Sequence, residues 1–81
     1  MKIIRAPVEV EVKKGWPVVI IWRDRRMRVR QVSDWWVARE RWWSRDEERV
    51  YFRLVTDTGT VEIYRSVDKS GEKWTLARMF D

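Results

Sequence analysis

The chain has 81 residues, enough for one small domain over residues 1–81 but too few to enclose a deep active site, and its 18 Lys and Arg against 13 Asp and Glu give a net charge of +5. It contains no cysteine and no histidine, which excludes disulfides, zinc fingers, thiol chemistry and Ser-His catalysis. No apolar run approaches the ~18 residues of a membrane span and the first residues do not form a signal peptide, so we expect a cytoplasmic protein with no membrane partner.

The excess of positive charge consists mainly of arginine. Thirteen of the 18 cationic residues are Arg, whose planar guanidinium makes bidentate and stacking contacts that a lysine ammonium does not. A basic chain is attracted to nucleic acid and to other polyanions. Because the chain also has no Asn and a single Gln, its many Arg and Glu residues equally indicate a thermophilic source and a thermostable protein. The arginine content alone leaves both explanations open.

Hydrophobic residues in the first third of the chain recur with a period of two, which is typical of β-strands. Val and Glu alternate over residues 8–12, and the apolar, β-branched run 18–22 predicts a central strand after the Gly-Trp-Pro break at 15–17. A turn at 23–26 leads into residues 26–31, where every second residue is an arginine. We therefore expect three strands that are joined by short turns.

The alternation changes phase in the segment that follows. Val32 lies on the same side as the arginines, so we expect a bend or bulge between Gln31 and Asp34. The next stretch, WWVARERWW at 35–43, fits a strand, and it also fits a helix capped by Ser33. Strand-like neighbours on both sides favour the strand, in which one Trp of each pair faces the core and the other points outward.

The second half of the chain continues the same pattern. We expect loops or turns at 44–49, 57–59 and 69–71, and strands at 50–56, 60–64 and 73–80. Short strands at this spacing predict the all-β class. The expected fold is a single antiparallel meander of five to six strands, curled into a barrel or half-barrel of SH3-like or OB-like size.

Several stretches carry a resemblance to a known family. They are PVEV (7–10), GWPVVIIWRDRRMRV (15–29), RVYFRL (49–54), GTVEIYR (59–65) and WTLARMFD (74–81), together with Trp35, Trp42 and Trp43. The chain resembles an uncharacterised bacterial family of small domains, and a similar pattern closes the polymerase-like Y-family subunit of the bacterial mutasome. The resemblance implies an association with DNA-damage tolerance and translesion synthesis, with a polymerase-like mutasome protein as partner. It implies no catalytic residues.

The basic and aromatic residues form the candidate binding site. Alternating arginines on a hairpin would make a one-sided stripe that pairs phosphates, and outward Trp and Tyr rings would stack on bases. We predict a site for single-stranded or duplex DNA formed by Arg26, Arg28, Arg30, Arg39, Arg41, Trp36, Trp43 and Tyr51. The alternative for the arginines is a solvated strand face paired with Glu9 and Glu11, and for the tryptophans it is the core.

Catalytic and metal sites find little support in the sequence. The acidic run Asp46-Glu47-Glu48 could bind Mg²⁺ or act as acid and base, but no phosphate-binding glycine motif and no candidate base accompany it, which favours a solvated loop. We therefore predict a non-enzymatic module, without cofactor or metal, that binds nucleic acid or supports a polymerase-associated assembly. The alternative is a protein–protein interaction module, with Trp and Arg hot spots or strand addition at a sheet edge.

Overall fold

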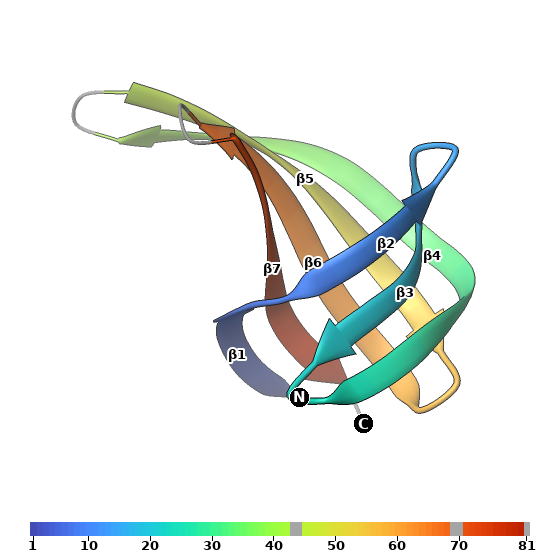
Figure 1. The fold of residues 1–81 in the computed structure, drawn as a ribbon. Helices are drawn as coiled ribbons and strands as arrows, with labels where there is room; N and C mark the ends of the chain where they lie inside the picture. Colours follow the sequence, from blue (N-terminus) through green and yellow to red (C-terminus); the bar gives the residue numbers. More distant parts are fainter. Residues whose placement is uncertain (43–44, 69–70, 81) are drawn as a thin grey trace.

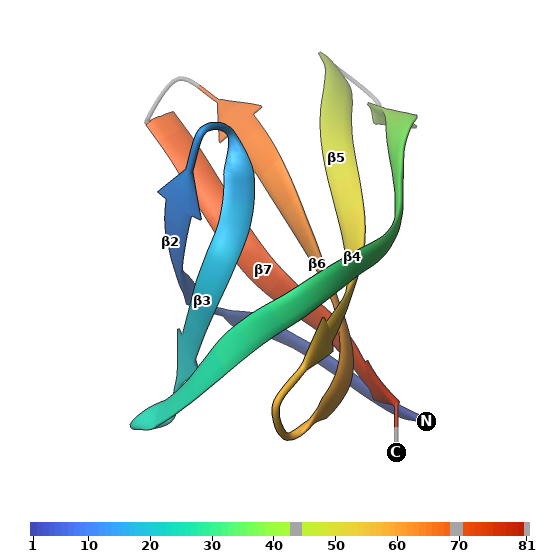
Figure 2. The same cartoon turned by 90° about the vertical axis from the view of Figure 1, so that its right-hand side faces the viewer.

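The computed structural model describes the backbone of residues 1–42, 45–68 and 71–80, and it describes the side chains of these residues except 40–42, 45, 46 and 68. Every regular element in this part of the chain is a β-strand. The strands are β1 (Lys2–Pro7), β2 (Glu9–Lys13), β3 (Trp16–Trp22), β4 (Arg25–Trp42), β5 (Arg45–Thr56), β6 (Gly59–Asp68) and β7 (Gly71–Phe80). They form one antiparallel sheet in the order β1-β7-β6-β5-β4-β3-β2, which curls into a half-barrel (Figures 1 and 2). The predicted all-β class and curled meander are therefore confirmed.

The curl of the sheet follows from the path of the chain between its two edges. From β2 to β7 each strand pairs with the next, while β1 pairs with β7 at the far edge. β1 ends at Pro7 and β2 begins at Glu9, so Val8 alone joins the two edge strands (Figure 1). The Val8 N–H donates to the Trp74 carbonyl oxygen at 3.2 Å, which ties this joint to β7. Because its two edges meet at one residue, the sheet has an enclosed inner face and an outer face.

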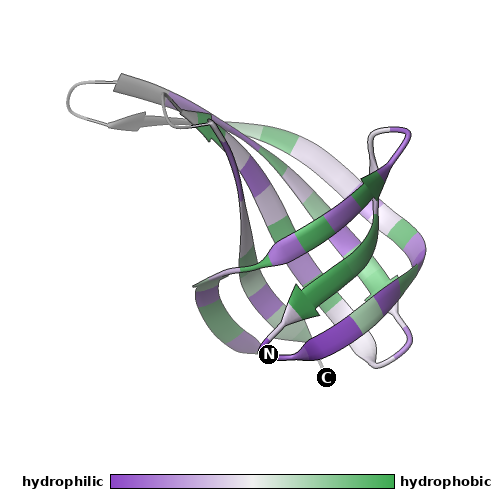
Figure 3. Ribbon diagram, in the orientation of Figure 1, coloured by the Kyte–Doolittle hydropathy of each residue, from purple (hydrophilic) through white to green (hydrophobic). Residues whose placement is uncertain are grey.

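The inner face carries the hydrophobic core. Alternation in β5 turns Phe52 and Leu54 inward, opposite aliphatic residues of β6. The buried cluster comprises Ile20, Met27, Phe52, Leu54, Val61, Ile63 and Leu76. Figure 3 shows the resulting alternation of hydropathy along β6 and β7, whereas β3 is hydrophobic over most of its length. Trp22 and Trp74 are partly buried and pack against this cluster.

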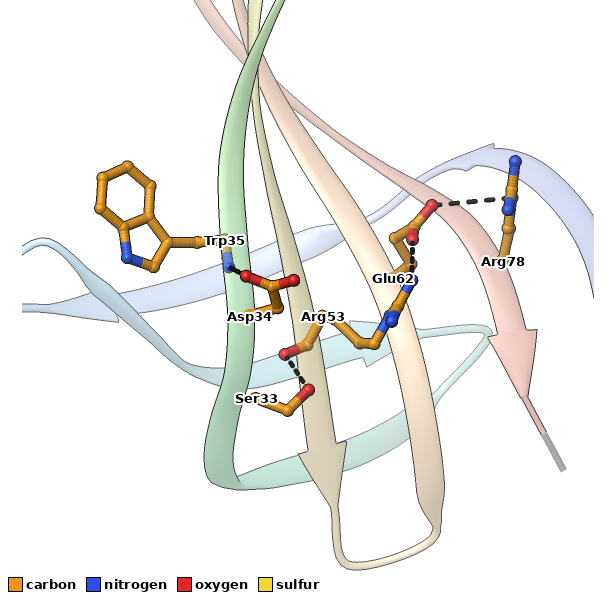
Figure 4. A network of polar contacts seen from close by, with 6 residues as sticks. All are labelled: Ser33, Asp34, Trp35, Arg53, Glu62 and Arg78. Carbon is orange, nitrogen blue, oxygen red and sulfur yellow. Dashed lines mark hydrogen bonds and ion pairs between the residues drawn. The ribbon is translucent and has the colours of Figure 1, made fainter.

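Two β-bulges in β4 keep most of its hydrophobic residues on the inner face, although the alternation of hydrophobic and polar residues changes phase along the strand. The register with β5 shifts at Arg30 and again at Ser33, each of which is an extra residue on β4. The second shift lies in the segment predicted to bend, and there the Ser33 hydroxyl donates to the Arg53 carbonyl oxygen at 3.1 Å (Figure 4). As a result the inward series is Met27, Val29, Val32 and Trp35, and the outward series is Arg26, Arg28, Gln31, Asp34 and Trp36.

The structure corrects three expectations about the strands. The described residues form seven strands rather than five or six, because residues 2–7 form β1 although they lack a period of two. The predicted strands 26–31 and 35–43 belong to one continuous strand that runs to Trp42, so the favoured strand is confirmed over 35–42 and the helix capped by Ser33 is not formed. The predicted loop at 44–49 is strand from Arg45 onward, where its residues pair with β4 and Glu48 forms a cross-strand ion pair with Arg39.

The turns use positive φ angles with and without glycine. Lys14 and Gly15 join β2 to β3 with φ angles of 53° and 84°, as a two-residue hairpin turn requires. Arg23 and Asp24, between β3 and β4, adopt φ angles of 51° and 62°, a conformation that costs L-residues about 1–2 kcal/mol each. The turn predicted at 57–59 is present. The one predicted at 69–71 depends on two residues, 69 and 70, that lie outside the described parts.

Candidate nucleic-acid interface

Aromatic side chains from three adjacent strands meet on the outer face of the sheet. The register sets Trp36 of β4 opposite Tyr51 of β5, and Tyr51 opposite Tyr64 of β6. The rings of Trp36 and Tyr51 are parallel, with an interplanar angle of 2° and centroids 5.3 Å apart, and the Tyr64 centroid lies 5.1 Å from that of Tyr51. We call Trp36, Tyr51 and Tyr64 the aromatic row. It brings together two of the residues predicted to stack on bases.

A fixed arginine lies on one side of the aromatic row. The guanidinium carbon of Arg49 is 4.6 Å from the centroid of the Tyr64 ring. Arg49 donates to the Tyr51 hydroxyl at 3.4 Å and forms an ion pair with Glu47 at 3.3 Å. Burial by itself lowers the pKa of Arg49, but the hydrogen bonds to Tyr51 and Glu47 raise this pKa above its usual value. The guanidinium therefore stays charged beside the row.

A buried carboxylate holds two further arginines on the other side of the row. Glu62 is only 4% exposed, and its oxygens lie 3.5 Å from Arg53 Nη2 and 3.6 Å from Arg78 Nε (Figure 4). The guanidinium carbon of Arg53 is also 5.7 Å from the centroid of Trp36 and 5.3 Å from that of Phe80. Two cations thus share one anion, which leaves a net positive charge next to the aromatic row.

A pocket of about 380 Å³ opens beside the row on the same face. Its charged and aromatic walls are Arg5, Arg49, Arg78, Glu62, Tyr51 and Tyr64. Because three guanidinium groups face a single carboxylate among these walls, the pocket favours an anionic ligand. It is large enough to take a phosphate group, and its polarity suits one.

Arg26 and Arg28 of the predicted arginine stripe lie on the same outer face, in the first half of β4, and Arg30 is the extra residue of the first bulge. Arg26 forms an ion pair with Glu11 at 2.9 Å, so the solvated-face alternative applies to this residue. The backbone of Arg28 is held at both ends by Asp57, whose Oδ1 accepts from the Arg28 N–H at 3.2 Å and whose N–H donates to the Arg28 carbonyl oxygen at 3.0 Å. The exposed side chains of Arg28 and Arg30 form no ion pair with any residue in the described segments.

Among the other predicted residues, Arg39 does not join the aromatic row. Arg39 lies on the inner face, where it pairs with Glu48 at 3.1 Å. The side chain of Arg41 and the whole of Trp43 lie outside the described residues. Because this segment is a strand, Glu47 and Glu48 point to opposite faces and pair with different arginines, so the acidic run does not form one site.

The sequence prediction missed Tyr64, Arg49 and Arg53. Tyr64 could have been found from the predicted hairpin turn at 57–59. A two-residue turn sets Thr56 opposite Gly59, and the same register sets Tyr51 opposite Tyr64. The two arginines then follow from alternation along β5, since each is two residues from Tyr51.

Two exposed tryptophans lie on the inner side, at the open end of the half-barrel. Trp35 is 53% exposed and meets Trp16 edge to face, with centroids 6.3 Å apart. Trp16 in turn lies 6.1 Å from Phe52 of the core. In Figure 4 the Trp35 side chain points away from the Arg53 and Glu62 side chains. Of the two neighbouring tryptophans of β4, the one on the core side is the exposed one, because β4 continues past the end of the core.

Comparisons with known proteins place the chain in a family. In the part of the chain that the structure describes, no helix has the length and apolar character needed to cross a membrane, and no three metal-binding side chains cluster. No curated protein and no solved structure matches the chain. A family model described as a domain of unknown function, DUF6504, matches residues 2–81. The model names neither an activity nor a source, so the resemblance to the bacterial mutasome subunit stays a prediction. The chain belongs to the DUF6504 family, which agrees with the uncharacterised small-domain family that the sequence predicts.

Proposed function

We propose that this chain is a non-enzymatic module that binds single-stranded nucleic acid across its outer face. The observation that supports it is the aromatic row of Trp36, Tyr51 and Tyr64, with arginines on both sides. Proteins that bind single strands combine aromatic rings, on which bases stack, with cations that follow the phosphate backbone. The outer face supplies both on one rigid sheet.

The end of the row offers a free ring face. The contacts of the Trp36 ring come from β5: Tyr51 stacks on one face, and the Arg53 guanidinium carbon lies 5.7 Å from the ring centroid. β5 is the strand that pairs with this part of β4, and no strand of the described chain lies on the other side. The second face of Trp36 is therefore turned toward an open edge. A base that stacks there would extend a parallel stack that already exists.

Cations for the phosphates lie at both ends of the row. β4 leads from Arg28 to Trp36 along the outer face, a path of roughly 25 Å at ~3.3 Å per residue. That length matches the smaller single-strand sites, which take roughly four nucleotides or more. At the other end, the pocket between Arg5 and Arg78 can take a phosphate. An association with a polymerase-like mutasome protein would be compatible with this activity, and it is supported by the sequence resemblance alone.

Trp36→Ala is expected to weaken binding of a fluorescein-labelled oligothymidylate of about twelve nucleotides by roughly tenfold to a hundredfold. The reason is that one base stacked on an aromatic ring contributes ~1–3 kcal/mol. Fluorescence anisotropy measures the affinity, and tryptophan quenching reports the stacking. Trp35→Ala is the matched control, because it removes the neighbouring and more exposed ring from the other face, and it should change the affinity less than about twofold. Equal losses in both variants, or no binding by the parent chain at low salt, would overturn the proposal.

Arg28→Ala is expected to flatten the dependence of binding on salt. Each phosphate contact on a single strand contributes about 0.7 to the slope of log K against log salt concentration. Titrations between about 50 and 200 mM salt should therefore show a slope reduced by roughly 0.7. Arg39→Ala removes the same charge from the inner face and should leave the slope nearly unchanged. If Arg39→Ala flattens the slope more than Arg28→Ala does, the bound oligonucleotide does not run along the outer face.

A further inference from the structure

The second half of β4 has a long unpaired edge. β3 pairs with β4 only from Arg25 to Arg28, and from Val29 to Trp42 the single partner of β4 in the described chain is β5. The pairing with β5 is regular from Asp34 to Trp42, with no bulge in this stretch. An edge of this kind presents backbone N–H and C=O groups that can pair with another chain.

The residues whose backbone groups face this edge can be assigned. The Trp35 N–H donates to the Oδ1 of Asp34 at 2.8 Å and is therefore not donated to β5 (Figure 4). In an antiparallel ladder the groups of alternate residues point to the same side, so the backbone groups of Val37 and Arg39 face the edge as well. At present one carboxylate, that of Asp34, covers one of these donors.

The side chains along the edge are apolar and exposed. Trp35 and Val37 are each 53% exposed, and both lie on the inner face next to Trp16. Charged residues, prolines and bulges are the usual features that protect edge strands from pairing. Between Trp35 and Ala38 β4 has none of them. An unpaired backbone and an exposed apolar surface therefore coincide on one segment.

We propose that a second copy of this chain pairs with the β4 edge, antiparallel and with Val37 on the two-fold axis. In this register each Trp35 lies opposite the Arg39 of the other copy, and each Trp36 lies opposite an Ala38. Guanidinium groups already lie over aromatic rings within the chain, as Arg23 does over Trp22 at 4.7 Å, so the first pair repeats a contact that this protein uses.

The chemistry of the segment favours a second copy over a charged partner. Asp34, Arg39, Glu40 and Arg41 carry no net charge together, so two such segments approach without overall repulsion even though the whole chain carries +5. The ion pair of Arg39 with Glu48 is exposed and does not hold Arg39 away from a partner ring. Because alanine is small, pairing of Trp36 with Ala38 leaves the ring face of Trp36 uncovered, and nucleic-acid binding and self-association do not exclude each other.

Cysteine cross-linking tests the proposed register directly, because the chain has no cysteine of its own. On the axis, the two Val37 Cα atoms would lie about 5.5 Å apart, within the range of a disulfide. Val37→Cys should form a disulfide-linked dimer rapidly on mild oxidation. Val67→Cys, at an exposed valine of β6, should do so many times more slowly. Equal rates for the two variants would overturn the register.

Sedimentation velocity over roughly 1–300 μM protein, without nucleic acid, tests the association itself. The parent chain should change from monomer to dimer within this range. Val37→Pro removes an edge-facing N–H that β5 does not use, so it should stay monomeric with an unchanged circular dichroism spectrum. Asp34→Ala frees the Trp35 N–H and should strengthen the association. A parent chain that remains monomeric throughout, or a Val37→Pro variant that still dimerises, would overturn the proposal, whatever the chain does with oligonucleotides.

Discussion

Leu54→Ala is expected to be among the most destabilising single substitutions in this protein, with a loss of about 2–5 kcal/mol in the free energy of unfolding. Leu54 is 0% exposed and lies between Val32 of β4 and Val61 of β6, at the centre of the curled sheet. Its partners on both adjacent strands face the core, so the structure relaxes only partly into the space that the side chain leaves. The whole free energy of unfolding of a native protein is only about 5–15 kcal/mol, so this single loss is a large part of it.

Thermal unfolding followed by circular dichroism measures the effect. For a domain of 60–100 residues each kcal/mol corresponds to about 4–8 °C, so Leu54→Ala should lower Tm by roughly 10–30 °C. Val55→Ala changes the next residue, which points to the outer face, and should cost no more than about 1 kcal/mol. If the two variants unfold at similar temperatures, the assignment of inner and outer faces on β5 is wrong.

Glu62→Gln should destabilise the fold by about 1–3 kcal/mol although it changes almost no volume. The carboxylate of Glu62 is buried and holds both Arg53 and Arg78, and Arg53 Nε already has no partner in the described part of the molecule. A neutral amide would leave two arginines without a counter-charge on the outer face. Since both guanidinium groups are partly exposed, water compensates for part of the loss, which keeps the expected value below that of a fully buried pair.

The matched control is Glu11→Gln, which makes the same chemical change in the exposed ion pair with Arg26. Exposed pairs contribute about 0–1 kcal/mol, so Glu11→Gln should unfold in urea at nearly the same midpoint as the parent chain. A Glu11→Gln variant that loses as much as Glu62→Gln would show that burial does not distinguish these two carboxylates.

The inward and outward positions of β5 and β6 could be predicted from the sequence because local alternation determines them. Val50, Phe52 and Leu54 repeat every second residue, and the turn at 57–59 sets their partners. The segment 45–49 could not be assigned in the same way, since its polar residues pair with β4 and Glu48 forms an ion pair with Arg39, and alternation of hydropathy reveals neither contact. β1 was missed for a related reason: Arg5 has a φ of 55° at an irregularity in the register, so the period of two is interrupted where β7 pairs with it.

The candidate site was predictable in composition but not in geometry. Trp36 and Tyr51 meet as the two-faced strand model suggested, while Arg39 is on the opposite face from them. Plain alternation explains why, because no bulge lies between Trp36 and Arg39. The two bulges act earlier in β4, where each reverses the phase, so that together they keep Arg28 on the face of Trp36; the sequence signal at Val32 indicated only one shift. The exposure of Trp35 depends on where the core ends, and that is set by the relative lengths of β3 and β4.

The position of β1, which Val8 joins to β2, also determines the order in which the strands can pair while the chain is synthesised. β1 pairs with β7 alone, and residues 2–7 leave the ribosome long before residues 75–79 are made. The hairpins from β2 to β6 can form as they emerge, since each strand finds its partner next to it in the sequence. Closure of the half-barrel must wait for the last strand. Until then β1 has no partner strand, so this long-range pairing is expected to limit the rate of folding and to be the step most exposed to misassembly.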